Sequence, residues 1–83
     1  MFQVILSNQA RKDLKKVAKI YLPKITASID ALATDPFLGE KMTGDFKGSY
    51  RIKIPPIRVV YTPDFTNNTI IIRAIGQRQG VYR

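Results

Sequence analysis

The chain has 83 residues, of which 14 are Lys or Arg and 6 are Asp or Glu, so its formal net charge is +8. With 45% hydrophobic residues it has the composition of a globular protein, and we expect one domain over residues 1–83. The sequence contains no Cys and no His, which excludes a disulfide framework, a cysteine nucleophile and a catalytic histidine. No apolar run approaches the roughly 20 residues that span a bilayer, so we expect a cytoplasmic protein without a membrane partner.

The N-terminal part of the chain is predicted to form a strand and then a basic helix. Residues 2–6, FQVIL, are short, apolar and β-branched, which is typical of a strand. Ser7 or Asn8 can cap the helix that follows, whose apolar residues recur at helical spacing as far as Tyr21. The opposite side of this amphipathic helix is positively charged and carries Arg11, Lys12, Lys15, Lys16 and Lys19.

The rest of the chain is predicted to add a second helix and three strands. Pro23 suits the first turn of that helix, and Asp35-Pro36 ends it because the residue before a proline avoids helical dihedral angles. A connector at 37–47 leads to strands at about 48–54, 57–62 and 69–75, the last of which is nearly all apolar and therefore expected inside the sheet. The order β-α-α-β-β-β predicts an α+β domain. In it an antiparallel helix hairpin packs on one face of a small, mainly antiparallel four-stranded sheet.

The stretch GSYRIKIPPIRVVY, residues 48–61, alternates between apolar and polar residues as a half-buried hairpin does. If the chain turns at its two prolines, positions 53 and 58 lie opposite each other and six apolar side chains share one face. Two prolines do not suit a two-residue hairpin turn, so we expect a wider loop or a cis Pro56. The other face of the hairpin then carries Arg51, Lys53, Arg58 and Val60.

These cations have almost no acidic neighbours in the sequence around them. Like charges that face each other across a sheet reduce stability, and residues 46–83 contain a single acid, Asp64. A bound anion would relieve the repulsion, and phosphate suits the planar fork of arginine. The alternatives are a solvated basic face or pairing with an acid from elsewhere in the fold. We favour an anion site, to which the C-terminal part can add Arg73, Arg78 and Arg83.

Three stretches of the sequence resemble one known family. They are Y-R-I-K-I at 50–54, I-R-V-V-Y at 57–61 and I-I-I-R-A-I-G-Q-R-Q-G-V-Y-R at 70–83. Together with the connector KMTGDFKGSY and the order of the elements, they resemble the RelE/ParE superfamily of toxins from type II toxin–antitoxin systems, and its RelE-like branch in particular. The likeness covers nearly the whole chain.

This resemblance implies a toxin that is held inactive by a cognate antitoxin, expected to be a small acidic protein. RelE-like members cut mRNA in the ribosomal A site, whereas ParE-like members block DNA gyrase and cut nothing. The preferred interpretation is therefore a ribosome-dependent mRNA endoribonuclease. The alternatives are a gyrase inhibitor that acts by protein contact and a basic RNA-binding module without activity.

Carried over position by position, the resemblance also implies a cleavage cluster. The alternating bases of the second strand correspond to Arg51 and Lys53, and the arginine of the third strand corresponds to Arg58. The arginine after the I-G-x sequence corresponds to Arg78, and the tyrosine near the end corresponds to Tyr82. RelE-like clusters tend to have lysine at the position of Arg51. This chain departs from that pattern, and arginine stays protonated and is a poor base.

RNA carries its own nucleophile, so cleavage by these residues needs no metal and no cofactor. The 2′-OH attacks the adjacent phosphorus once a base removes its proton and cations stabilise the developing negative charge. Lys53, with arginines on both sides, is the predicted base. Arg58 and Arg78 are predicted to hold the phosphate, and one of them to supply a proton to the leaving oxygen. Tyr82 is predicted to stack on a base or to orient the 2′-OH.

The other predicted substrate contacts are basic residues outside this catalytic set. Arg73 could equally serve the fold by covering apolar surface with its aliphatic stem. The lysines of the first helix could touch ribosomal RNA or could simply be its solvated side. The predicted substrate contacts are Arg51, Arg73, Arg83, Lys15 and Lys19.

Overall fold

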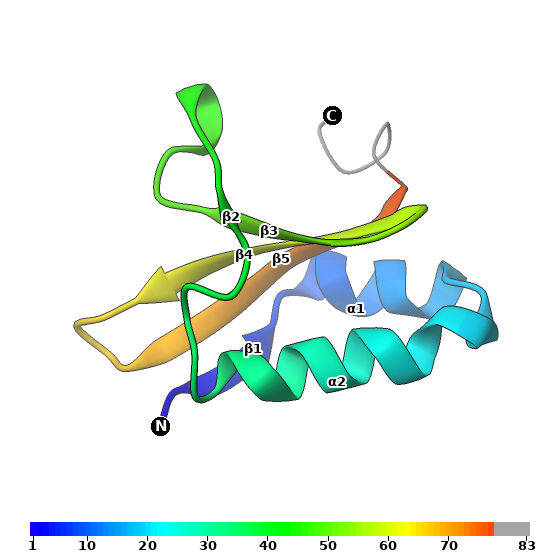
Figure 1. Ribbon diagram of the computed structural model, residues 1–83, viewed down its shortest axis with the longest axis horizontal. Coiled ribbons are helices and arrows are strands. Elements are labelled where there is room, and N and C mark those ends of the chain that lie inside the picture. Colours follow the sequence, from blue (N-terminus) through cyan, green and yellow to red (C-terminus); the bar gives the residue numbers. More distant parts are fainter. Residues whose placement is uncertain (78–83) are drawn as a thin grey trace.

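The structure, a computed structural model, describes residues 1–77 of the chain (Figure 1). Helices α1 and α2 lie on one side of a twisted sheet, and the short 3-10 helix η2 stands on the other side. No helix within this described part is both long and apolar enough to span a membrane. The elements in chain order are β1 (Gln3–Leu6), α1 (Asn8–Lys16), η1 (Lys19–Tyr21), α2 (Leu22–Leu32), β2 (Glu40–Lys41), η2 (Gly44–Phe46), β3 (Tyr50–Ile54), β4 (Ile57–Asp64) and β5 (Thr69–Gln77).

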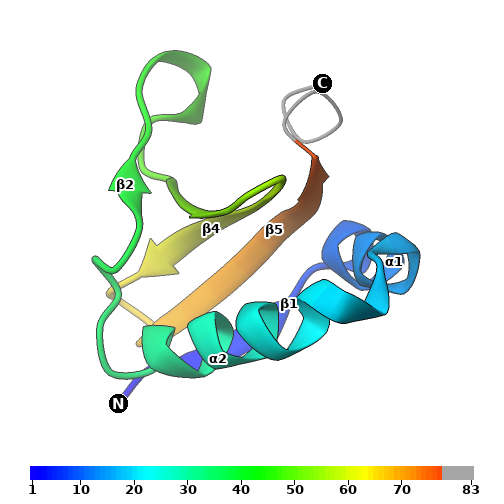
Figure 2. The same ribbon diagram turned by 45° about the vertical axis from the view of Figure 1, so that its right-hand side comes forward.

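The sheet has five strands in the order β1-β5-β4-β3-β2. Strand β1 pairs with β5 in parallel, and every other neighbouring pair is antiparallel. The predicted α+β class, with both helices on one face and the last strand inside the sheet, is confirmed. The predicted number of four strands is wrong, because the connector contributes the two-residue strand β2 at the sheet edge (Figure 2).

The hydrophobic core lies between the helices and the sheet. It contains Val59 and Tyr61 from β4, Ile72 from β5, and Ile25 and Leu32 from α2, all of which are fully buried. The side chains that alternate with them along the strands therefore point away from the helices. This alternation decides which residues of β3 and β4 are available on the uncovered face of the sheet.

Helix α1 begins at the predicted cap. The hydroxyl of Ser7 accepts a hydrogen bond from the Ala10 N–H and donates one to the Arg73 carbonyl, so the cap also ties the helix to β5. The helix ends at Lys16, although its apolar stripe had predicted that it would continue to Tyr21. The backbone is extended at the two residues that follow, and this change of direction brings both Val17 and Tyr21 against the core.

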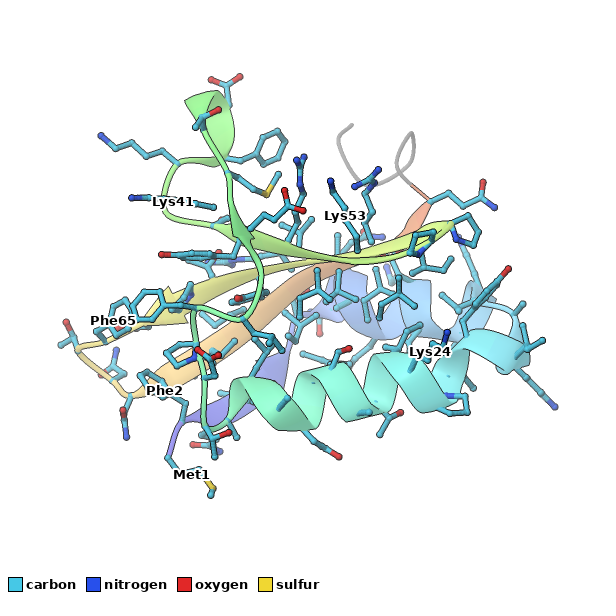
Figure 3. All side chains as sticks on the ribbon, viewed as in Figure 1. Met1, Phe2, Lys24, Lys41, Lys53 and Phe65 are labelled. Carbon is cyan, nitrogen blue, oxygen red and sulfur yellow. The ribbon has the colours of Figure 1, made fainter. Side chains whose placement is uncertain are left out.

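Aromatic side chains hold the connector between α2 and β2 against one end of the sheet. Phe37 stacks on Phe65 with ring centroids 5.5 Å apart, and it meets the edge of Tyr50 at 5.8 Å. Phe65 in turn meets Phe2, and both lie at the same end of the molecule in Figure 3. The path of the chain into β2 is therefore fixed by packing on both sides.

Candidate functional site

The hairpin of β3 and β4 has the predicted register. Lys53 pairs with Arg58 and Arg51 with Val60, while the apolar residues between them pair on the helix side. The peptide bond between Pro55 and Pro56 is cis, which was one of the two expected solutions at this turn. Figure 3 shows Lys53 on the face of the sheet away from the helices. We call the surface formed by Arg51, Lys53 and Arg58 the cationic face.

Strand β5 carries small residues next to Arg58 and Val60. Gly76 pairs with Arg58 and Ala74 pairs with Val60, so the positions next to the basic strand carry no long side chain. Arg58 is half-buried, and within residues 1–77 no carboxylate lies within ion-pair distance of it. Its guanidinium is therefore available to an anion that approaches the uncovered side of the sheet.

An acidic residue does lie on the cationic face, contrary to the expectation of unpaired cations. Glu40 of β2 pairs in register with Arg51, so the two side chains share a face. Its carboxylate oxygens lie 3.1 Å from the Lys53 ammonium and 3.5 Å from the Arg51 guanidinium. The hydrogen bond from Lys53, with further attraction from Arg51, holds the pKa of Glu40 below its ordinary value. Two of the three cations thus share one carboxylate within the protein.

This pairing of Glu40 with Lys53 and Arg51 was not evident from the sequence. Glu40 is the only glutamate in the chain, but it is 11 residues before Arg51 and lies in a segment without periodicity. Asp64, the acid that sequence reasoning did consider, is used elsewhere. Its carboxylate accepts hydrogen bonds from Thr66 and Asn67 in the turn between β4 and β5. These bonds hold the pKa of Asp64 below its ordinary value.

Arg73 lies at an irregularity of the sheet. The register between β4 and β5 shifts there, because Val60 pairs with Ala74 but Tyr61 pairs with Ile72. The Arg73 Nε donates a hydrogen bond to the Thr62 hydroxyl at 3.2 Å. Thr62 is four residues from Arg58, or roughly 13 Å along the strand. The structure therefore places Arg73 beside the cationic face but not within its centre.

The remaining predicted site residues are not brought to the cationic face by the described structure. Lys15 is an exposed residue of α1 and Lys19 an exposed residue of η1, and both belong to the layer on the other side of the sheet. Their contact with RNA stays a prediction for a separate surface. Arg78, Tyr82 and Arg83 lie outside the described residues.

The described part of β5 nevertheless ends beside the hairpin. Its last residue, Gln77, pairs with Ile57, which directly precedes Arg58 in β4. The cationic face thus combines the Arg58 guanidinium, which has no acidic partner among residues 1–77, with an ammonium and a second guanidinium that share the Glu40 carboxylate. Such a set can hold a phosphate and can both accept and donate a proton.

Comparison with known proteins identifies the family. A family model described as the ParE toxin of the type II toxin–antitoxin system parDE matches residues 4–82. The chain belongs to the RelE/ParE superfamily of toxins. A curated relative from Methanocaldococcus jannaschii, named "Putative toxin RelE1", is 36% identical over 86 residues, which cover 99% of this chain and 96% of the relative. This RelE/ParE protein is therefore the toxin of a toxin–antitoxin module.

Solved structures share the RelE/ParE fold. The toxin–antitoxin complex RelBE2 from Mycobacterium tuberculosis matches with a TM-score of 0.83 and 22% identity, over 93% of this chain and 98% of that one. The isolated RelE toxin of E. coli matches with a TM-score of 0.83 and 16% identity, over 93% of this chain and 84% of that one. At these sequence identities the likeness establishes the fold of this chain. It does not establish which reaction the chain catalyses.

Proposed function

We propose that this toxin is a ribosome-dependent endoribonuclease that cleaves mRNA without a metal ion. The observation that carries the proposal is the convergence of Arg51, Lys53 and Arg58 from two adjacent strands on the face that the helices leave uncovered. The relative named as a RelE toxin supports the RelE-like branch, and with it the ribosome as the setting of the reaction. The sequence has no His or Cys to serve in catalysis, and RNA carries a nucleophile of its own in the 2′-OH.

The first step is binding of the scissile phosphate. Arg58, which has no acidic partner among residues 1–77, meets a non-bridging oxygen of the phosphate first. Arg51 stabilises the charge that grows on the phosphorane oxygens as the 2′-oxygen attacks. Arg78 and Tyr82 keep their predicted roles of a further phosphate contact and a stacking or orienting group.

The proton transfers fit the contact between Glu40 and Lys53. Lys53, the base expected from the sequence, lies 3.1 Å from a carboxylate oxygen of Glu40. In such a pair the carboxylate is the proton acceptor and the ammonium is the donor. We therefore assign the 2′-OH proton to Glu40 and protonation of the leaving 5′-oxygen to Lys53. The O2′–P bond forms and the P–O5′ bond breaks, which leaves a 2′,3′-cyclic phosphate.

A translation extract tests the proposal. Purified toxin is added to programmed ribosomes, and the mRNA is mapped by primer extension. We expect cuts that depend on ribosomes, persist in EDTA-treated toxin returned to the extract, and fall at least about 100-fold with Arg58→Ala. The matched control is Lys24→Ala, which removes one charge from the helical layer (Figure 3). Intact mRNA with the unaltered toxin contradicts the proposal.

A second candidate function is inhibition of DNA gyrase by protein contact. The observation in its favour is the matching family model, which is that of ParE toxins. The same purified toxin is added to a gyrase supercoiling reaction. Loss of supercoiling together with intact mRNA favours this candidate over the ribonuclease. If neither reaction is affected, the toxin acts as a basic RNA-binding module.

A further inference from the structure

The position of Glu40 suggests a role beyond proton transfer. Its two carboxylate oxygens each contact a different cation, Lys53 at 3.1 Å and Arg51 at 3.5 Å. A phosphate bound between these two side chains would present two oxygens to the same donors. The carboxylate therefore occupies the place that the proposed function gives to the scissile phosphate.

This internal pairing is easily displaced. The Glu40 side chain is 55% exposed, and its partners Lys53 and Arg51 are 43% and 30% exposed. Ion pairs at such exposure are weak because water and salt screen them. Because the Glu40 side chain is exposed, its carboxylate can turn away from the cations while β2 stays paired with β3. A phosphate offers more negative charge and a better fit to the guanidinium fork.

The third cation supplies the entry point. Arg58 lies opposite Lys53 on the next strand and has no carboxylate partner within residues 1–77. We propose that Glu40 is an internal counter-anion of the cationic face: RNA binds first at Arg58 and then displaces the Glu40 carboxylate from Lys53 and Arg51, which frees this carboxylate to accept the 2′-OH proton. Glu40 thereby sets the affinity of the face for RNA. The inference rests on the proposed function in one respect, that this face binds an RNA phosphate.

Binding measured without cleavage tests the inference. The probe is a short single-stranded RNA with methylated 2′-oxygens, which cannot be cut, and the readout is fluorescence anisotropy over a range of salt concentrations. The variant Glu40→Gln keeps the size of the side chain and removes its charge. The matched control Asp45→Asn makes the same change of net charge at an exposed position of η2 that forms no ion pair within residues 1–77.

We expect Glu40→Gln to bind the probe roughly threefold to tenfold more tightly than the unaltered toxin. The slope of log affinity against log salt concentration should be steeper by about 0.7 for each protein cation that the substitution frees to contact RNA. Asp45→Asn should change the affinity by less than about twofold, because Asp45 forms no ion pair with the cationic face within residues 1–77. Equal affinities of the two variants, or weaker binding by Glu40→Gln, overturn the inference alone. If none of the three proteins binds the probe, the inference is overturned, whereas the proposed function is decided by mRNA cleavage in the translation extract.

The thermal unfolding of each variant is measured together with its RNA binding, which shows whether the variant is folded. Glu40 is exposed and contacts only exposed or half-buried cations, so Glu40→Gln should remain folded. A second variant, Glu40→Ala, removes the amide that could mimic the carboxylate hydrogen bonds. It should bind at least as tightly as Glu40→Gln, and weaker binding by a folded Glu40→Ala also overturns the inference.

Discussion

The hydroxyl group of Tyr61 donates a hydrogen bond to the carbonyl oxygen of Pro36 at 2.9 Å. It also accepts one from the N–H of Gly39 at the same distance. Tyr61 is fully buried in β4, and burial raises the pKa of its hydroxyl. Because Glu40 directly follows Gly39, this pair of hydrogen bonds fixes the start of β2 from inside the core. The acid on the cationic face is thus positioned by a residue on the opposite face of the sheet.

We expect Tyr61→Phe to lower the free energy of unfolding by about 1–3 kcal/mol. The substitution keeps the ring but leaves the Gly39 N–H without its acceptor and the Pro36 carbonyl without its donor. Urea unfolding followed by circular dichroism measures the change. Tyr50→Phe is the control, because Tyr50 stacks on Tyr61 with ring centroids 5.6 Å apart but forms neither bond. Equal stability of Tyr61→Phe and the unaltered toxin would argue against this anchor.

Gly39→Ala should destabilise the connector through a steric clash. A Cβ at Gly39 would lie 2.5 Å from the carbonyl oxygen of Arg51 and 3.0 Å from the Tyr61 ring. Since the nearest atom belongs to the backbone of β3, the connector itself has to move, at a cost of about 1–3 kcal/mol. The same urea titration measures it. Gly44→Asn is the control, because Gly44 has open space around it and its φ of 67° is tolerated by asparagine.

The titration of Glu40 should report its ion pairs directly. As the only glutamate in the chain, it gives one side-chain carboxyl signal of its type in ¹³C NMR. We expect its midpoint below the ordinary glutamate range, because the Lys53 ammonium favours the ionised form. In Lys53→Met the midpoint should rise toward the ordinary value. No change between the two proteins would show that the ion pair does not form in solution.

The lowered pKa of Glu40 also fixes the sign of its effect on stability. A carboxyl group with a depressed pKa in the folded state stabilises the fold above its unfolded pKa, and this contribution is lost as the pH falls through the folded pKa. Between neutral pH and acid, Glu40→Gln should therefore lose less stability than the unaltered toxin. The measurement is the urea midpoint over that range. A larger loss in Glu40→Gln contradicts the assignment.

Arg58→Ala should abolish growth arrest in cells while the protein stays folded. Arg58 supplies the free guanidinium of the cationic face, and no buried hydrogen bond of the described structure depends on it. Induced expression without antitoxin, followed by cell density, measures the effect. Lys24→Ala should arrest growth as the unaltered toxin does, since it removes a charge from the helical layer. Full toxicity of a folded Arg58→Ala would remove Arg58 from the site.

RNA binding should weaken steeply with salt, since phosphate contacts release condensed cations. For a single strand the slope of log affinity against log salt changes by about 0.7 for each contact. Arg58→Ala should reduce the slope by roughly that amount, whereas Lys24→Ala should leave it unchanged. Anisotropy with the 2′-O-methylated probe measures both. A flat salt response of the unaltered toxin would count against an RNA substrate.

The β3–β4 hairpin was predictable because its residues repeat a simple pattern. Tyr50, Ile52 and Ile54 alternate with Arg51 and Lys53, and one register alone buries the whole apolar set. The same alternation predicts that the cations lie on the face of the hairpin opposite the apolar side chains. Hydrophobic periodicity was thus sufficient for both the local fold and the core of the candidate site.

Strand β2 was not predictable in this way. Two residues, Glu40 and Lys41, are too few to show a period, and both are exposed. Their position is set by tertiary contacts, namely the hydrogen bonds of Tyr61 and the close approach of Gly39 to β3. The ion pairs of Glu40 depend on that placement, so a search for acids near the cations in sequence could not find them. The end of α1 at Lys16 has a similar origin, since Val17 reaches the core from extended backbone.

The parallel pairing of β1 with β5 has a consequence for the newborn polypeptide. In β5, Ile70 pairs with Val4 and Gly76 pairs with Arg58. Strands β1 and β4 therefore cannot complete their pairing until β5 has left the ribosome. Until then the helices have no complete sheet to pack against. The sheet of this toxin can therefore form only after β5 has been made and has left the ribosome.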